Sequence, residues 1–252
     1  MAAIDVDIAR VTHHFPGQPP LIALQNVSLT VAPGEFVALI GPSGCGKSTL
    51  LRLAAGLLQP STGQVRLAGQ PAAELRRRQE IGWMAQQSAL LPWRTVLDNV
   101  RLPRQLKRNG ASPAQSPEEL LARVGLAQFA GAYPATLSGG MQQRVALART
   151  LAVDASLWLM DEPFAALDEL TREALAGELL AIWQTVRPTV LWVTHHLSEA
   201  VRLADRVVVL SARPGAVAGC VPVALPRPRD DTGPAFQAVV RQVRCLLTGG
   251  GQ

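Results

Sequence analysis

The sequence predicts an α/β fold in which helices cover both faces of a parallel β-sheet. The first observation is three short, continuous apolar runs, at residues 157–160, 190–193 and 207–210, which alternate with helical segments. Strands buried on both faces give such unbroken runs, because neither side of the strand meets water. In addition, the first eighty residues are rich in strand-like segments, and residues 88–153 have helical periodicity. We therefore expect an N-terminal antiparallel β subdomain, an α/β core and a helical insert subdomain.

The N-terminal part contains short apolar or alternating segments that are separated by Pro and Gly. The expected strands are residues 4–11, 27–31, 36–40 and 65–67. One helix is expected over residues 48–58, where the apolar residues fall on a broad face and Gly56 and Pro60 mark the end. A strand, a glycine-rich loop and a helix thus follow one another here.

The helical insert is expected over about residues 88–153. Its clearest helix start is Ser116-Pro117-Glu118-Glu119, with a serine N-cap, proline in the first turn and glutamate at the capping-box position. We assign residues 1–225 to one domain. Residues 226–252 are rich in Pro and Arg and end in a run of Gly, so we expect a short, loosely ordered C-terminal tail.

Composition limits the class of protein. An apolar content of 48% is ample for a buried core, and no uninterrupted apolar run is long enough to cross a membrane. The first residues lack the pattern of a secretory signal, so we expect a cytoplasmic chain. Cys45, Cys220 and Cys245 match neither a disulfide framework nor a zinc site. The net charge is +5, but the dense basic run at residues 76–78 has no interleaved aromatic residues, so we expect no nucleic-acid partner.

The glycine-rich loop has the spacing of a phosphate-binding loop. Its glycines let successive backbone N–H groups face inward and form an anion nest at the start of the following helix. Of 24 basic residues only Lys47 and Lys107 are lysine, and a compact ammonium reaches between β and γ phosphates where a planar guanidinium would not fit. Ser48 would bind Mg²⁺. The expected nucleotide-binding set is Gly41, Pro42, Ser43, Gly44, Cys45, Gly46, Lys47, Ser48 and Thr49.

Two carboxylates follow the apolar run at residues 157–160. Asp161 and Glu162 would lie at the carboxyl edge of a buried strand, where sheets of this class hold their ligands. Asp161 would hold Mg²⁺ through water, and Glu162 would polarise the water that attacks the γ-phosphate. An acid pair before Pro163 is also typical of an ordinary helix start. The phosphate-binding loop favours the catalytic interpretation.

A second anion site is expected at residues 137–144, Leu-Ser-Gly-Gly-Met-Gln-Gln-Arg. Ser138 would cap a helix, and Gly139 and Gly140 would allow the backbone to approach a phosphate closely. A chain that already has a phosphate-binding loop has little use for another such site of its own. The motif therefore fits a nucleotide held by a second copy of the chain, although an ordinary glycine-rich helix start would have the same appearance.

The motifs at residues 41–48, 137–144 and 157–163, in this order and at these separations, resemble those of the ATP-binding subunits of ATP-binding cassette (ABC) transporters. The resemblance covers about residues 4–214. It implies a P-loop NTPase (RecA-like) core that binds ATP and Mg²⁺ and hydrolyses ATP. It also implies a head-to-tail homodimer that drives an integral membrane permease fed by an extracytoplasmic substrate-binding protein, at the cytoplasmic face of the cell (inner) membrane.

The resemblance assigns further roles to single residues. Phe15 resembles the aromatic residue that stacks on adenine, and Asp168 resembles the acid that joins the sites of the two subunits. Gln86 resembles the glutamine that senses Mg²⁺ and the γ-phosphate and contacts the membrane partner; spacing alone separates it from Gln87. The implied catalytic residues are Glu162, His195, Lys47 and Gln86, and the implied metal site is Ser48, Gln86 and Asp161.

His195 resembles the switch histidine that contacts the γ-phosphate. It directly follows the end of a predicted strand, which is its place in the family. An acid commonly follows this histidine, whereas this sequence has His196. Hydrolysis remains the expected activity, and the substitution affects only the local details of the switch.

Residues 90–100, 161–173 and 211–215 resemble the branch that imports nitrate, aliphatic sulfonates and taurine and that also includes carriers of pyrimidine vitamin precursors. The substrate is therefore expected to be a small anion or organosulfur compound, with a pyrimidine or thiamine precursor as an alternative. A soluble ABC ATPase of DNA repair or translation, or an inactive nucleotide-binding regulator, are further alternatives. The absence of a visible second cassette or nucleic-acid patch argues against the soluble ATPase. The intact catalytic residues argue against the inactive regulator.

Overall fold

A computed structural model describes residues 2–106 and 115–249 and contains two β-sheets. The larger, six-stranded sheet has the order β10-β9-β3-β8-β7-β6. All its neighbouring strands are parallel except β10, which pairs antiparallel with β9. Its strands are β3 (Phe36–Ile40), β6 (Ile81–Met84), β7 (Leu157–Asp161), β8 (Thr189–Val193), β9 (Arg206–Leu210) and β10 (Val217–Pro222). The parallel sheet expected from the apolar runs is confirmed.

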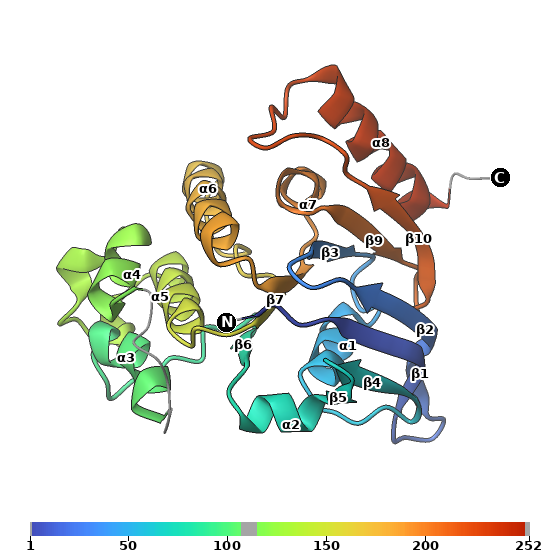
Figure 1. Cartoon of the computed structure of the whole chain (residues 1–252), viewed down its shortest axis with the longest axis horizontal. Coiled ribbons are helices and arrows are strands. Elements are labelled where there is room, and N and C mark those ends of the chain that lie inside the picture. Colours follow the sequence, from blue (N-terminus) through green and yellow to red (C-terminus); the bar gives the residue numbers. More distant parts are fainter. Residues whose placement is uncertain (1, 107–114, 250–252) are drawn as a thin grey trace.

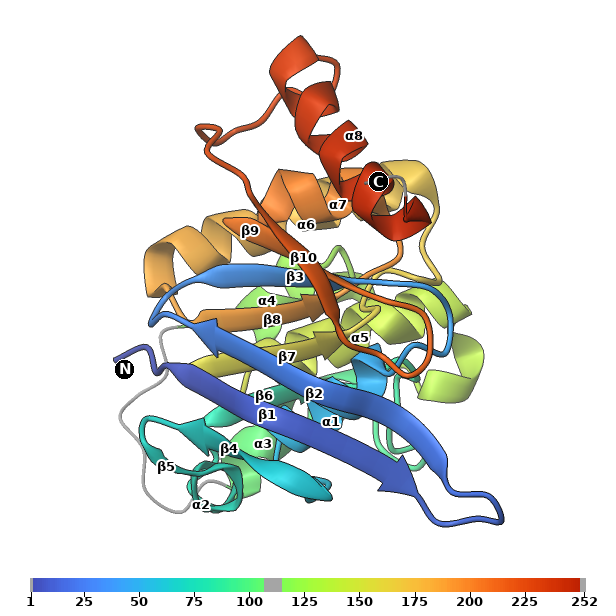
Figure 2. The same cartoon turned by 90° about the vertical axis from the view of Figure 1, so that its right-hand side faces the viewer.

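The smaller sheet is antiparallel and has the order β2-β1-β4-β5. Its strands are β1 (Val6–Phe15), β2 (Leu21–Val31), β4 (Thr62–Leu67) and β5 (Gln70–Pro71), and the short helix α2 (Ala72–Arg77) follows it. Figure 2 shows this sheet in front of the parallel one. The sequence grouped residues 36–40 with the N-terminal strands. In the structure these residues form β3, which lies between β9 and β8 in the parallel sheet, and all five of them are buried.

The two faces of the parallel sheet belong to two hydrophobic cores. Val37, Leu159 and Leu191 face the antiparallel sheet and helix α1 (Lys47–Ala54). The alternate residues, among them Phe36, Met160 and Trp192, face the helices on the other side. This double burial explains the continuous apolar runs. Helix α1 ends earlier than expected because Gly56 has a φ of +64° and terminates the helical geometry.

The helical insert is formed by α3 (Val96–Leu106), α4 (Pro117–Arg123), the short 3₁₀ turns η1 (Ala127–Phe129) and η2 (Pro134–Thr136), and α5 (Gly139–Leu151). Helices α3, α4 and α5 pack on one another at one end of the molecule (Figure 1). Ser116 and Glu119 form the predicted capping box. Three more helices, α6 (Glu169–Val186), α7 (Leu197–Leu203) and α8 (Pro234–Thr248), follow the insert.

The prediction of a loosely ordered tail after residue 225 is wrong for the described residues 226–249. They contain helix α8, which packs on α7, β9 and β10 and buries Phe236, Val240 and Val243. The Pro and Arg content that indicated a tail instead belongs to the connection between β10 and α8. These three buried positions have helical spacing, so the apolar face of α8 was present in the sequence.

Two arginines attach this connection to the core. Arg229 donates hydrogen bonds to the backbone carbonyls of Val201 (2.6 Å), Ala204 (2.6 Å) and Val223 (3.0 Å), which lie at the end of α7 and after β10. Arg227 stacks on the ring of Trp183 and pairs with Asp205. Burial, with the nearby charge of Arg227, lowers the pKa of Arg229 to about 10, so the side chain is still charged at neutral pH. Arg229 thus supplies a charged donor to carbonyls at the C-terminal end of α7 and after β10.

We predict that Arg229→Met lowers the free energy of unfolding by about 2 kcal/mol, because the partly buried carbonyls lose their charged donor. Chemical denaturation measures the change. Arg241→Met, on the exposed side of α8, is the matched control and should leave stability within about 0.5 kcal/mol of the unsubstituted protein. Equal stability of the two variants would show that Arg229 does not anchor the connection.

Candidate active site

A cleft of about 280 Å³ lies over the glycine-rich loop between β3 and α1. The loop keeps its shape through two glycines in left-handed conformations, Gly44 with φ +73° and Gly46 with φ +103°. A Cβ on Gly46 would come within 2.6 Å of Leu24 Cδ2, so a larger residue would push the loop away from β2. Nine expected residues line the cleft, namely Phe15, Ser43, Gly44, Gly46, Lys47, Ser48, Thr49, Gln86 and Glu162.

Lys47 is buried in the base of the loop. Its Nζ donates hydrogen bonds to the carbonyls of Gly41 (2.7 Å) and Pro42 (3.0 Å). The ammonium is therefore held at the loop rather than in solvent, and it places a positive charge beside the backbone N–H groups that begin α1. Cys45 contributes backbone only, since its side chain is fully buried.

Ser48 and Asp161 form the candidate metal site. Ser48 Oγ donates to Asp161 Oδ1 at 3.1 Å, which joins the first turn of α1 to the carboxyl end of β7. Burial raises the pKa of Asp161, and the hydrogen bond from Ser48 opposes this rise. A buried carboxylate beside a hydroxyl is a set of oxygen donors that suits Mg²⁺, and the cation would offset the cost of burying the charge. These two residues therefore fit the predicted role.

Glu162 is fixed in an unusual backbone conformation one residue later. Its φ is +48°, in the left-handed region, and its N–H donates to the carbonyl of Val193 at 2.9 Å. Its Oε2 accepts a hydrogen bond from Gln86 Nε2 at 3.2 Å and lies 3.5 Å from His195 Nδ1. Strained backbone of this kind is common where a side chain must be aimed. Gln86, rather than Gln87, is the glutamine that reaches the carboxylate.

Sequence analysis missed Gln143, which positions the loop that carries Glu162. Its Nε2 donates to the carbonyl of Glu162 at 3.1 Å, and its Oε1 accepts from the N–H of Ala166 at 2.8 Å. The side chain is buried. Gln143 lies on α5, so it joins the helical insert to the catalytic loop. The signal available in the sequence was its place within the 137–144 motif.

Ser138, Gly139, Gly140 and Asp168 are not among the residues that line the cleft. Ser138 caps α5, as expected, and accepts from the N–H of Met141 at 3.3 Å. Asp168 caps α6 by accepting from the N–H of Thr171, and this hydrogen bond lowers the pKa of the Asp168 carboxyl. Ser138 and Asp168 are both exposed. Hence neither motif completes the nucleotide cleft of its own chain.

His195 and His196 form a stacked pair, with ring centroids 4.1 Å apart. His195 is exposed and faces Glu162, whereas His196 is partly buried behind it. Burial, followed by the neighbouring His195 and Arg172, lowers the pKa of His196. The residue that stands in place of the usual acid thus loses its proton more readily than a free histidine does.

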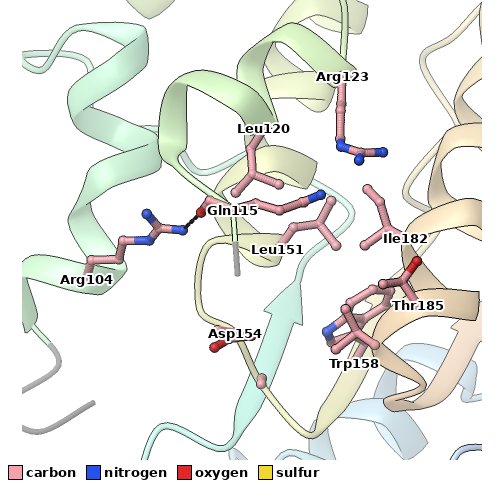
Figure 3. A pocket seen from close by; sticks show the side chains of 11 residues that line it. Arg104, Gln115, Leu120, Arg123, Leu151, Asp154, Trp158, Ile182 and Thr185 are labelled. Carbon is pink, nitrogen blue, oxygen red and sulfur yellow. Dashed lines mark hydrogen bonds between the residues drawn. The ribbon is translucent and has the colours of Figure 1, made fainter. Parts of the chain in front are cut away.

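Another hollow lies away from these groups (Figure 3). It is lined by Arg104 and Leu120 of the insert, Trp158 at the start of β7 and Ile182 of α6. None of the expected site residues lines it. The chemistry expected from the motifs is therefore gathered at the opposite, carboxyl ends of the parallel strands.

Comparison with known proteins agrees with this arrangement. Residues 24–165 match the model of the family described as ABC transporter. The chain belongs to this family. An uncharacterized ABC transporter ATP-binding protein of Methanocaldococcus jannaschii is 51% identical over 89% of this chain and 84% of its own length. The chain is thus an ABC-type ATPase, and the predicted fold and activity class are confirmed.

Relatives also support the branch that the sequence resembles. The aliphatic sulfonates import ATP-binding protein SsuB of Cupriavidus pinatubonensis is 49% identical over 95% of this chain and 76% of its own length. SsuB of Bacillus subtilis is 43% identical over 87% of this chain and 85% of its own length.

A solved structure carries the same fold. The dimeric structure of MJ0796, a bacterial ABC transporter cassette, is 34% identical, covers 88% of this chain and 100% of its own, and superimposes with a TM-score of 0.78. A dimeric structure of a post-hydrolysis state of the same cassette, bound to ADP and Pi, superimposes with a TM-score of 0.77. Within residues 2–106 and 115–249 of this ABC chain, no helix is long and apolar enough to span a membrane.

We predict that Glu162→Gln lowers ATP hydrolysis at least about 100-fold while ATP binding is kept, since the amide cannot accept a proton from water. Phosphate release and equilibrium nucleotide binding measure the two effects. Glu178→Gln, an exposed change on α6, is the control and should leave turnover unchanged. Normal hydrolysis by the Glu162 variant would remove this residue from the mechanism.

We also predict that Gln143→Ala slows hydrolysis about 10-fold or more and costs about 1–3 kcal/mol of stability, because the Glu162 carbonyl and the Ala166 N–H lose their partner. The neighbouring Gln142→Ala is a matched control, since the side chain of Gln142 bonds Ser88, Pro134 and Leu137 and, within the described residues, makes no hydrogen bond to the loop that carries Glu162. It should slow turnover much less. If both variants hydrolyse ATP equally well, Gln143 does not position the catalytic loop.

Proposed function

We propose that this chain is the ATP-hydrolysing subunit of an importer that takes up a small anion or organosulfur compound, such as an aliphatic sulfonate, taurine or nitrate, through a separate membrane permease. The observation that carries the proposal is the similarity, over most of both chains, to ATP-binding proteins named for aliphatic sulfonate import. The intact arrangement around Glu162 supports an energising rather than a passive role.

In this proposal the nucleotide enters the cleft with its phosphates on the loop N–H groups and on Lys47. Ser48, Asp161 and Gln86 would hold Mg²⁺. The metal would supply positive charge that stabilises the charge developing on the phosphate oxygens. Glu162 accepts the proton of the attacking water, and His195 contacts the γ-phosphate. Phe15 stacks on the adenine. Its ring is partly buried and packs edge-on against His13, with centroids 4.8 Å apart, which fixes its orientation.

The active unit is proposed to be a homodimer. Ser138, Gly139 and Gly140 would close over the ATP held by Lys47 of a second copy, with Asp168 joining the two sites. Their exposure outside their own cleft supports this arrangement. The dimeric cassette MJ0796, with a similar fold, supports it as well.

The permease contact is proposed to lie between Gln86 and Asn99. Asn99 is fully buried and bonds the backbone of Leu91, Arg94 and Thr95, which makes this loop rigid. Trp93, at the tip of the loop, is 71% exposed. An exposed tryptophan on a rigid support is typical of a protein interface. The chain would therefore sit peripherally at the cytoplasmic face of the cell (inner) membrane, beneath a permease that is fed by an extracytoplasmic substrate-binding protein.

The cargo is expected to contact the binding protein and the permease rather than this chain. An importer of a pyrimidine or thiamine precursor is therefore the alternative within the same class. A soluble ABC ATPase without a permease is the alternative outside it. The two importers would be stimulated by a transport substrate, whereas the soluble ATPase would not.

The test is to purify the chain with its permease and binding protein in lipid and to measure ATP hydrolysis with taurine, an alkanesulfonate, nitrate or a thiamine precursor. We expect stimulation by a sulfonate and loss of that stimulation in Trp93→Ala, with basal hydrolysis by the isolated subunit unchanged. Stimulation by DNA or ribosomes instead would overturn the transport role.

A further inference from the structure

The segment between β9 and β10, residues 211–216, touches the nucleotide cleft although none of the functions above uses it. Its two ends are joined by a hydrogen bond from Ser211 N to Ala216 O at 2.8 Å, and Ser211 Oγ accepts from Ala216 N at 3.0 Å. Gly215 N donates to Ala23 O at 3.0 Å, and Gly215 O accepts from Gln25 N at 2.9 Å. The loop is thus closed on itself and fixed to β2.

Gly215 brings this loop into direct contact with the phosphate-binding loop. A Cβ at residue 215 would lie only 1.9 Å from the carbonyl oxygen of Cys45 and 3.3 Å from Leu24 Cδ2. Such a contact is impossible for any residue with a side chain, so the two loops must pack backbone to backbone. The position of residue 213 relative to the nucleotide cleft is therefore set by the main chain on both sides.

Arg213 uses this position to enter the cleft. Its side chain lines the same cleft as Lys47 and Phe15. Its Nε donates to Gly44 O at 3.0 Å, at the tip of the phosphate-binding loop. Within residues 2–106 and 115–249, Arg213 forms no ion pair with an acidic side chain, so its charge is not neutralised by the protein. Within the same described residues the two terminal nitrogens of the guanidinium donate no hydrogen bond to the protein, and each can donate to a ligand.

The place of Arg213 also indicates which part of the nucleotide it would meet. Lys47 is held at the base of the loop by Gly41 and Pro42. The loop of Arg213 instead rests on Ala23, close along β2 to Leu21, which pairs with Phe15 in the antiparallel sheet. The guanidinium lies between the phosphate-binding loop and the strands that carry the candidate adenine contact. A nucleotide spanning these two ends presents its ribose and α-phosphate there.

We propose that Arg213 is a nucleotide-binding residue that contacts the ribose and α-phosphate, with Gly215 as the residue that docks its loop. The proposal rests on the cleft being the ATP site described above. A planar guanidinium held at one nitrogen is well suited to donate two parallel hydrogen bonds to a phosphate. The guanidinium is expected to affect nucleotide binding rather than the hydrolytic step, because it bonds Gly44, whereas Glu162 bonds Gln86 and faces His195.

The test measures ATP and ADP affinity by isothermal titration calorimetry for the full chain and for Arg213→Ala. We expect affinity for both nucleotides to fall by the same factor, about 10-fold, because the α-phosphate is common to both and a hydrogen bond to a charged group is lost. The loss of affinity should exceed any change in the turnover number at saturating ATP, and the melting temperature should fall less than it does in Gly215→Ala. Arg213→Lys, which keeps the charge but not the fork of donors, should lose less affinity. Arg241→Ala is the control for removal of one exposed positive charge.

Two further variants keep this inference separate from the proposed site. Lys47→Ala should weaken ATP more than ADP; if the unsubstituted protein binds no nucleotide, or Lys47→Ala has no effect, the proposed site itself is wrong. Gly215→Ala should lower both affinity and melting temperature, because it forces the loops apart. If ATP binds to Arg213→Ala within about twofold of the unsubstituted protein, or if Arg213→Ala melts several degrees lower as Gly215→Ala does, Arg213 is not a nucleotide contact.

Discussion

The hydrogen-bond ladder between β3, β8 and β7 is the constraint on which the active site depends. Its register pairs Leu39 with Val193 and Val193 with Asp161. The ladder continues one residue beyond the strands, since Val193 O holds Glu162 N at 2.9 Å and Leu39 O accepts from Thr194 N at 3.3 Å. Hence Glu162, the proposed catalytic carboxylate, and the residues that lead to His195 are placed by the main chain of a sheet buried on both faces. A shift in register would misplace them together.

This explains which parts could be predicted from the sequence. The buried strands and the loop at residues 41–48 were predicted because double burial and phosphate binding each demand a local pattern. Gln143 and the fixed orientation of Glu162 depend on contacts between segments far apart in the chain, and no local pattern encodes these. The same is true of Arg229, whose partners lie on α7 and after β10. Proline and arginine indicated disorder there, although Arg229 orders the segment by donating to partly buried carbonyls.

The residues outside the cleft divide into two kinds. Gln143 is bonded to the segment of its own chain that carries Glu162, so it supports the candidate site from within. Ser138 and Asp168 cap helices and remain exposed, and the sequence predicted that both act at a nucleotide shared with a second copy of the chain. A local motif can therefore be predicted well even where its function depends on a second molecule, because capping requires only nearby residues.

The segment that follows β6 joins the catalytic carboxylate to the surface of the insert. Gln86 bonds Glu162, and the carbonyls of Ser88 and Ala89 accept from Arg149 of α5 at 2.7 and 2.8 Å. Asn99 then holds Leu91 on both its backbone groups, next to the exposed Trp93. Each link is a hydrogen bond to backbone or to a charged group, so Gln86 cannot move far unless the Arg149 bonds break or the insert moves with it. The physical connection between the nucleotide cleft and the exposed tryptophan is thus short, polar and carried by the insert.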